Sequence, residues 1–150
     1  MKLAIGDKAP DFKGIKQDGK EISLNDFRGR KLVLYFYPKD NTGGCTAEAC
    51  SLRDAYDDFQ DKGYAIVGVS PDNERSHTGF ILKHRLPFPL IADSNHAIAE
   101  LYGVWGEKKL YGKTYMGILR TTFVIDEKGI IEHIVEKVDT KNHAAQLLKP

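Results

Sequence analysis

Three short apolar runs constrain the fold of this chain more than any other feature of its sequence. They are KLVLYFY at 31–37, YAIVGVS at 64–70 and TTFVID at 121–126, and they are rich in β-branched and aromatic residues. Continuous apolar runs of this length are typical of strands that are buried on both faces of a sheet. We therefore expect a central sheet that is covered on both sides.

Helical patterns lie between these runs. In 45–61, four apolar residues recur at spacings of three and four, which places them on one face of a helix: Ala49, Leu52, Tyr56 and Phe59. Shorter helices are predicted at 73–85, 95–102 and 141–149, further strands at 88–93 and 130–136, and an N-terminal hairpin that turns at 17–20. Strands that alternate with helices predict an α/β fold with a largely parallel or mixed sheet.

Length and charge narrow the class of protein. A chain of 150 residues suits one domain, which we expect to span 1–150. The net charge of +1 offers no electrostatic case for binding nucleic acid or an anionic membrane. No apolar run has the length of a membrane span, and the opening MKLAIGDKAPDFKG lacks the apolar segment of a secretory signal. We therefore expect a cytoplasmic protein, in which a close cysteine pair indicates redox chemistry or a metal.

The two cysteines of the chain are Cys45 and Cys50, five positions apart. In a helix over 45–61, Cys45 lies on the apolar face and Cys50 points roughly 140° away, with about 7.5 Å of rise between them. Their α-carbons are then roughly 8–9 Å apart, beyond the limit of about 7 Å for a disulfide. Either the two thiols never bond, or bonding requires the first turns of the helix to unwind.

The residues before Cys45 favour a reactive thiol. Pro38 ends the buried strand, and DNTGG at 40–44 is a loop of turn formers, so Cys45 falls in the first turn of the helix. Free N–H groups and the helix dipole favour the thiolate, which is the nucleophilic form of cysteine. Thr42 could place a hydroxyl beside the sulfur, and the N–H groups of Gly43 and Gly44 could donate to a bound oxygen.

Arg120 is unexpected at the start of the apolar strand 121–126, because a guanidinium beside a buried strand is costly unless it is paired. If this strand lies next to 31–37, Arg120 could reach the sulfur of Cys45. The alternative is a salt bridge at the surface. Glu48 is expected to cap the helix or to form an ion pair.

These residues resemble a known family. PKDNTGGC at 38–45 fits the P-x-x-x-T-x-x-C signature of the peroxiredoxins, with Pro38, Thr42 and Cys45 at the required positions. The stretch YFYPKDNTGGCTAEACSLRD at 35–54 resembles the atypical two-cysteine subgroup called bacterioferritin comigratory protein or peroxiredoxin Q. GVWGEK, GKTYMGILRTTFVID and NHAAQLL are also similar to it, so the resemblance runs from about residue 5 to the C-terminus.

The resemblance implies a thioredoxin-like fold and a thiol peroxidase that acts on hydrogen peroxide and organic hydroperoxides. Cys45 matches the peroxidatic cysteine and Cys50 the resolving cysteine, so the implied intermediates are a Cys45 sulfenic acid and a Cys45–Cys50 disulfide. Thr42 and Arg120 match the residues that prepare the thiolate and the peroxide, and Pro38 matches a proline that shields the pocket. The implied reductant is thioredoxin, with glutaredoxin or glutathione as alternatives. No metal, flavin or haem is implied, and the subgroup suggests a monomer.

One departure from the subgroup stands beside the cysteine. Gly43 occupies a position where the family usually has proline. Glycine widens the conformational range of the loop. We expect activity to survive, with a change in the rigidity of the pocket or in the ease of unwinding.

Two other functions use the same cysteines. A thioredoxin-type oxidoreductase is disfavoured because the chain lacks C-x-x-C. A non-enzymatic redox sensor or binding protein would be oxidised without efficient turnover. Structural alternatives are a buried inert thiol for Cys45, a bystander for Cys50 and a helix N-cap for Thr42.

The remaining candidates receive structural interpretations. The five histidines lack metal-ligand spacing with the cysteines and are expected at the surface or hydrogen-bonded: His77, His84, His96, His133 and His143. Four residues of a glycine-punctuated loop are expected to pack against the protein: Trp105, Tyr111, Tyr115 and Met116. The alternative is a wall near the pocket or a contact surface for the reductant.

Overall fold

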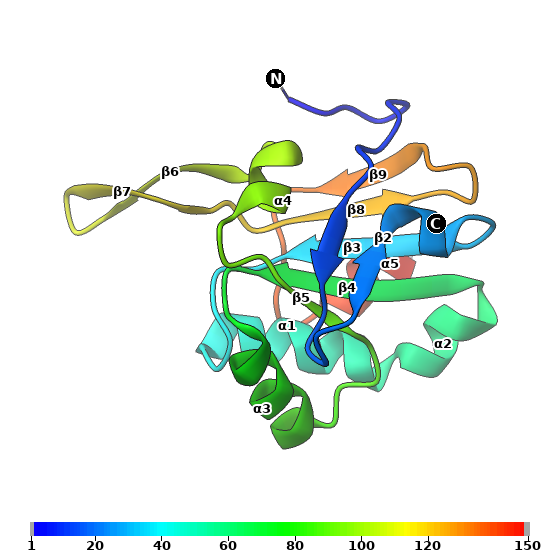
Figure 1. The fold of residues 1–150 in the computed structure, drawn as a ribbon, viewed down its shortest axis with the longest axis horizontal. Coiled ribbons are helices and arrows are strands. Elements are labelled where there is room, and N and C mark those ends of the chain that lie inside the picture. The colour runs from blue at the N-terminus through cyan, green and yellow to red at the C-terminus, as the bar shows by residue number, and fades with distance from the viewer. Residues whose placement is uncertain (1, 149–150) are drawn as a thin grey trace.

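A five-stranded mixed sheet forms the centre of the protein in the computed structural model, which describes residues 2–148 (Figure 1). The strand order is β5-β4-β3-β8-β9. β3 (Lys31–Phe36), β4 (Tyr64–Ser70) and β5 (Leu90–Ala92) run parallel, whereas β8 (Thr121–Ile125) and β9 (Ile131–Val135) pair antiparallel. The three apolar runs are thus the adjacent strands β4, β3 and β8, and the predicted mixed sheet is confirmed.

Both faces of this sheet are covered. On one face lie α1 (Gly43–Asp54), α2 (Tyr56–Asp61), α3 (Glu74–His84) and α5 (His143–Leu148), and on the other α4 (Ala97–Leu101) with β1 (Lys13–Ile15), β2 (Glu21–Ser23) and the 3₁₀ turn η1 (Leu24–Phe27). β3 contributes Leu32, Leu34 and Phe36 to one core and Val33 and Tyr35 to the other. This alternation explains why its sequence is apolar throughout.

The helix predicted at 45–61 differs from the observed one. It begins two residues earlier, at Gly43, and Ala55 divides it into α1 and α2. At Ala55 the backbone has φ −101° and ψ 12°, outside the helical range. The apolar periodicity continues across this break because Leu52 and Phe59 are both fully buried, so the sequence pattern alone does not reveal it.

The packed loop predicted around Trp105 is wrong. The segment is an antiparallel hairpin of β6 (Trp105–Leu110) and β7 (Lys113–Ile118), which projects from the body of the protein (Figure 1). Trp105 does pack, stacked on His96 with 3.8 Å between ring centroids. Tyr111, Tyr115 and Met116 are exposed.

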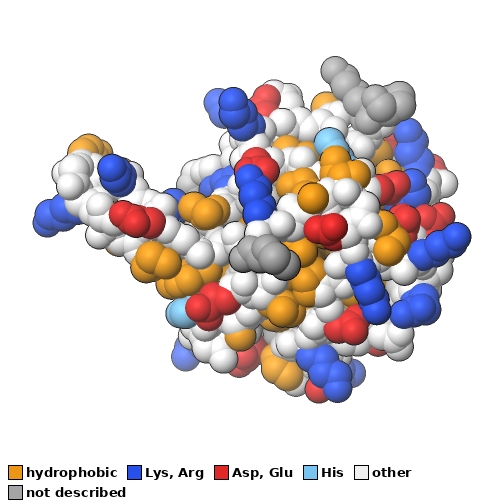
Figure 2. All heavy atoms as spheres, turned by 90° about the horizontal axis from the view of Figure 1, so that it is seen from above, with side chains coloured by type: hydrophobic (Ala, Val, Ile, Leu, Met, Phe, Trp, Pro, Cys, Tyr) orange, Lys and Arg blue, Asp and Glu red, His pale blue; other side chains and the backbone are white. Residues whose placement is uncertain are grey.

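Surface charge agrees with the small net charge of the sequence. Acidic and basic side chains are interspersed over the face shown in Figure 2. Among residues 2–148, no helix is both long and apolar enough to span a bilayer.

Candidate active site

Cys45 is the third residue of α1, and its side chain enters the core beneath that helix. Only 1% of the residue is exposed. The N–H of Thr46 donates to the carbonyl of Thr42 (2.9 Å), so the N–H groups of residues 43–45 precede the intrahelical ladder. The sulfur therefore lies at the positive end of the helix dipole, as predicted.

Arg120 reaches this sulfur because β8 pairs with β3. Phe36 at the end of β3 lies opposite Thr121, which places Arg120 beside the loop that leads to Cys45. Nη2 of Arg120 donates to Sγ of Cys45 (3.2 Å). A β-carbon at Gly44 would stand 3.4 Å from Nη2, so glycine leaves room for the guanidinium. The predicted contact is confirmed, and the surface salt bridge is excluded.

Glu48 holds the other side of the guanidinium. Nη1 of Arg120 donates to Oε1 of Glu48 (2.6 Å), and the glutamate is fully buried. Of the two roles expected for Glu48, the structure shows the ion pair. One planar guanidinium thus bridges the carboxylate and the sulfur through two different nitrogens, a fixed fork that the single nitrogen of lysine does not have.

The second oxygen of Glu48 has no hydrogen bond. It lies 3.4 Å from Nε2 of His143, which Thr122 Oγ1 already contacts at 2.8 Å. His143 Nδ1 faces Oε1 of Gln146, an oxygen that also accepts from a backbone N–H. The histidine proton is therefore on Nδ1, Nε2 accepts from Thr122, and burial lowers the pKa of His143. Glu48 Oε2 therefore faces a lone pair and receives no hydrogen bond, so Arg120 alone stabilises the charge of this carboxylate.

We predict that the carboxyl group of Glu48 makes the free energy of unfolding depend on pH. Burial raises the pKa of Glu48 from 4.5 to about 7, although the charge of Arg120 opposes the shift. A raised pKa means that the folded protein binds the proton more tightly, so this stabilisation is complete below pH 4.5 and is lost as pH rises through about 7. Relative to Glu48→Gln, the wild-type free energy of unfolding should fall over this window, measured by urea denaturation. Parallel pH profiles for the two proteins would contradict the assignment.

Thr42 and Pro38 lie near the start of α1 without the direct contact to the sulfur that Arg120 makes. Thr42 is the N-cap residue of α1, but its Oγ1 donates to the carbonyl of Lys39 (2.9 Å). Among residues 2–148, no hydrogen bond joins Thr42 to the sulfur of Cys45, because its hydroxyl is turned to the carbonyl of Lys39. Pro38 is half-buried and lies two residues after the end of β3.

Cys50 lies away from Cys45 on the same helix. It is half-buried, and its sulfur is 4.0 Å from Nδ1 of His84 at the end of α3. Both cysteines are free thiols. Because α1 is intact from Gly43 to Asp54, a Cys45–Cys50 disulfide requires its first turns to open, as the sequence predicts.

Gly43 allows a direct test of that opening. It is the first residue of α1, a β-carbon there would meet nothing within 4 Å, and Thr42 has φ −89° and ψ 156°, which suits a residue before proline. We expect Gly43→Pro to raise the free energy of unfolding by about 0.4–1 kcal/mol. The same substitution should slow disulfide formation after oxidation, measured by stopped-flow. Gly43→Ala is the control, since it leaves φ unlocked; faster disulfide formation in the proline variant would contradict this prediction.

A polar cluster beside this loop could not be predicted from the sequence. Asp40, Asp72 and His77 are brought together with potential ligand atoms within 4.8 Å of one another, a spacing that could hold a metal ion. Asp40 and His77 are buried and hydrogen-bonded to each other. The residues are 32 and 5 positions apart, so no local motif reveals the cluster.

Comparisons with known proteins agree with this geometry. The model of the AhpC/TSA family matches residues 5–134. The chain is 46% identical to the peroxiredoxin Bcp of Bacillus subtilis over 149 residues, covering 99% of this chain and 95% of the relative. It is 45% identical over 141 residues to the peroxiredoxin Bcp of Escherichia coli K12, with coverage of 94% and 90%.

Solved structures show the same similarity. Peroxiredoxin Q of Xanthomonas campestris superimposes with a TM-score of 0.86 at 36% identity, over 91% of this chain and 87% of that one. A mutant of the PrxQ of Xylella fastidiosa superimposes with a TM-score of 0.92 at 31% identity, over 99% and 94%.

Proposed function

The chain belongs to the AhpC/TSA family as a peroxiredoxin with a thioredoxin-like fold and thiol peroxidase activity, and we propose that Cys45 is its peroxidatic nucleophile. The observation that carries this assignment is the hydrogen bond from Arg120 to the sulfur at the start of α1. A guanidinium and a helix N-terminus both stabilise the thiolate, which attacks the peroxide.

In the first step, the Cys45 thiolate attacks one oxygen of the peroxide. An S–O bond forms and the O–O bond breaks, so sulfur is oxidised to the sulfenic acid and the peroxide is reduced. The second oxygen leaves and takes up a proton as water or an alcohol. In this proposal Arg120 and the N–H groups of Gly43 and Gly44 stabilise the charge on the oxygens, and Thr42 and Pro38 shape the approach to the buried sulfur.

In the second step, Cys50 acts as the resolving thiol. The first turns of α1 unwind, and the sulfur of Cys50 attacks the sulfenic sulfur of Cys45. The S–S bond forms and the hydroxyl leaves as water after taking up the proton of Cys50. An external dithiol then reduces the disulfide by thiol–disulfide exchange, which restores both thiols.

The reductant that we propose is thioredoxin. The family implies a dithiol reductant of this type and a peroxide substrate. We further propose a single domain over 1–150 that works as a monomer in the cytoplasm, where thiols are kept reduced.

Intact mass after one equivalent of hydrogen peroxide tests the mechanism directly. We expect the loss of two hydrogens and of both free thiols, with a peptide that links Cys45 to Cys50. Oxygen on Cys45 with Cys50 still free would keep the peroxidase and require another resolving thiol. No reaction within minutes would overturn the assignment of Cys45. A multiple-turnover assay with thioredoxin then distinguishes the enzyme from a redox sensor, which would be oxidised once.

A further inference from the structure

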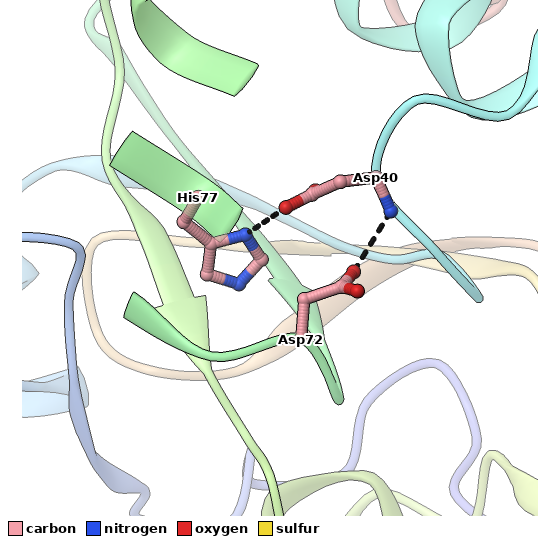
Figure 3. Close-up of side chains that lie close together, drawn as sticks. All are labelled: Asp40, Asp72 and His77. Carbon is pink, nitrogen blue, oxygen red and sulfur yellow. Dashed lines mark hydrogen bonds and ion pairs between the residues drawn. The ribbon is translucent and has the colours of Figure 1, made fainter. Parts of the chain in front are cut away.

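Asp40, in the loop between β3 and α1, has an unusually complete set of buried hydrogen bonds. Oδ1 accepts from the hydroxyl of Tyr37 (2.6 Å), and Oδ2 accepts from Ser76 Oγ (2.8 Å) and His77 Nδ1 (2.7 Å). The backbone N–H of Asp40 donates to Oδ2 of Asp72 (2.8 Å) (Figure 3). Three of these four bonds tie the loop to the β4–α3 connection and the first turn of α3.

His77 must carry a positive charge in this arrangement. Nδ1 faces a carboxylate oxygen of Asp40, and Nε2 faces the carbonyl of Ile91 (2.9 Å). Both partners accept hydrogen bonds, so both ring nitrogens carry protons. The pair is a desolvated ion pair, since the two side chains are at most 1% exposed.

The partners of Asp40 keep its carboxylate ionised. Burial by itself would raise the pKa of Asp40, but hydrogen bonds from His77, Tyr37 and Ser76 outweigh this effect and hold the pKa below its usual value. Burial raises the pKa of Tyr37, so its hydroxyl stays protonated as a donor. The same bonds argue against a metal ion, because both nitrogens of His77 hold protons and the imidazolium would repel a cation.

The location of this pair relative to Cys45 gives it a role in the reaction. Asp40 stands five residues before Cys45, and on the far side of Cys50 the helix is held by Ser51, whose Oγ accepts from the N–H of Ala144 (3.0 Å). Arg53 adds a bond from Nη1 to the carbonyl of His84 (2.8 Å). The segment that must open for a Cys45–Cys50 disulfide is therefore bracketed by Asp40 on one side and these two contacts on the other.

We propose that Asp40 and His77 are positioning residues that latch the loop before Cys45 in the peroxide-reactive conformation. This inference rests on the proposed function of Cys45. Neither residue touches the sulfur: the latch acts through the loop, which must hold Cys45 against Arg120. Loosening the latch should slow the reaction with peroxide and expose the buried sulfur, because both depend on the closed loop.

Two substitutions of His77 distinguish its bond to Asp40, which forms the latch, from its bond to the carbonyl of Ile91. The amide nitrogen of asparagine can replace Nδ1 and still donate to Asp40, whereas that of glutamine can replace Nε2 and donate only to the Ile91 carbonyl. Both remove the charge. Placed in a Cys50→Ser background, each variant retains one thiol, Cys45, so that two rates report on a single sulfur.

The two rates are sulfenic acid formation with hydrogen peroxide, trapped with dimedone, and the reaction of Cys45 with the bulky Ellman reagent. For His77→Gln we expect peroxide oxidation to slow roughly tenfold to a hundredfold and the Ellman rate to rise at least roughly tenfold. For His77→Asn both rates should stay closer to those of the Cys50→Ser parent. If the histidine variants fold poorly, Tyr37→Phe replaces them in the test. It removes one bond to Asp40 and should change both rates in the same directions by smaller factors.

A stability control completes the experiment. Ile131→Ala removes a fully buried side chain from the core on the opposite face of the sheet and should weaken the whole fold without touching the loop. The latch is overturned if Ile131→Ala reproduces both rate changes at the same loss of unfolding free energy as His77→Gln. It is also overturned if His77→Gln and His77→Asn change the two rates alike. If the parent thiol fails to react with peroxide at all, the proposed function fails, while the Ellman rates still decide whether the latch exists.

Discussion

Arg120→Met should slow the oxidation of Cys45 by hydrogen peroxide roughly 10²–10³-fold, measured in single turnover by stopped-flow. The substitution removes the donor 3.2 Å from the sulfur and the positive charge that favours the thiolate. Losses of this size are typical when one donor to developing oxyanion charge is removed.

The same substitution leaves Glu48 buried without its partner. An unpaired buried charge costs roughly 3–5 kcal/mol. The loss here should be smaller near neutral pH, because the pKa of Glu48 is already about 7 beside Arg120 and rises further without it, so the carboxylate can take up a proton. The double variant Arg120→Met, Glu48→Gln should recover much of the free energy of unfolding and none of the rate. Recovery of the rate together with stability would show that Arg120 acts on Cys45 only through the fold.

Cys50→Ser should reduce thioredoxin-driven turnover at least roughly tenfold and cause sulfenic acid to accumulate on Cys45. Without the second thiol no intramolecular disulfide forms, and thioredoxin must attack a sulfenic acid at a residue that is 1% exposed. Turnover is measured with the complete thioredoxin system, and the acid is measured by dimedone adduct mass.

The first oxidation step provides the control for this variant. Cys50 contacts His84 and has no bond with Cys45, so peroxide should oxidise Cys45 in Cys50→Ser at close to the wild-type rate. A small dithiol such as dithiothreitol should still support turnover, because it can reach the sulfenic acid directly. Unchanged turnover with thioredoxin would remove Cys50 from the mechanism.

The strands and the reactive loop could be predicted from the sequence because the signals for them are local. The apolar runs at 31–37, 64–70 and 121–126 each form a strand within one residue of the predicted bounds. Cys45 follows Pro38 and a run of turn formers, which is enough to place it at a helix start. The break at Ala55 was not predicted because buried apolar residues continue with helical spacing on both sides of it. The hairpin of β6 and β7 was not predicted because its aromatic residues suggest burial, although they are exposed.

By itself, the sequence determined the α/β alternation, the position of Cys45 at the start of a helix and the need for that helix to open before Cys50 can bond. Each follows from residue spacing and helix geometry along one short stretch of chain. Only the tertiary structure decided the partners of the buried charges: Arg120 with Glu48, and His77 with Asp40. These residues are 72 and 37 positions apart, and a buried charge is stable only beside the partner that packing brings to it.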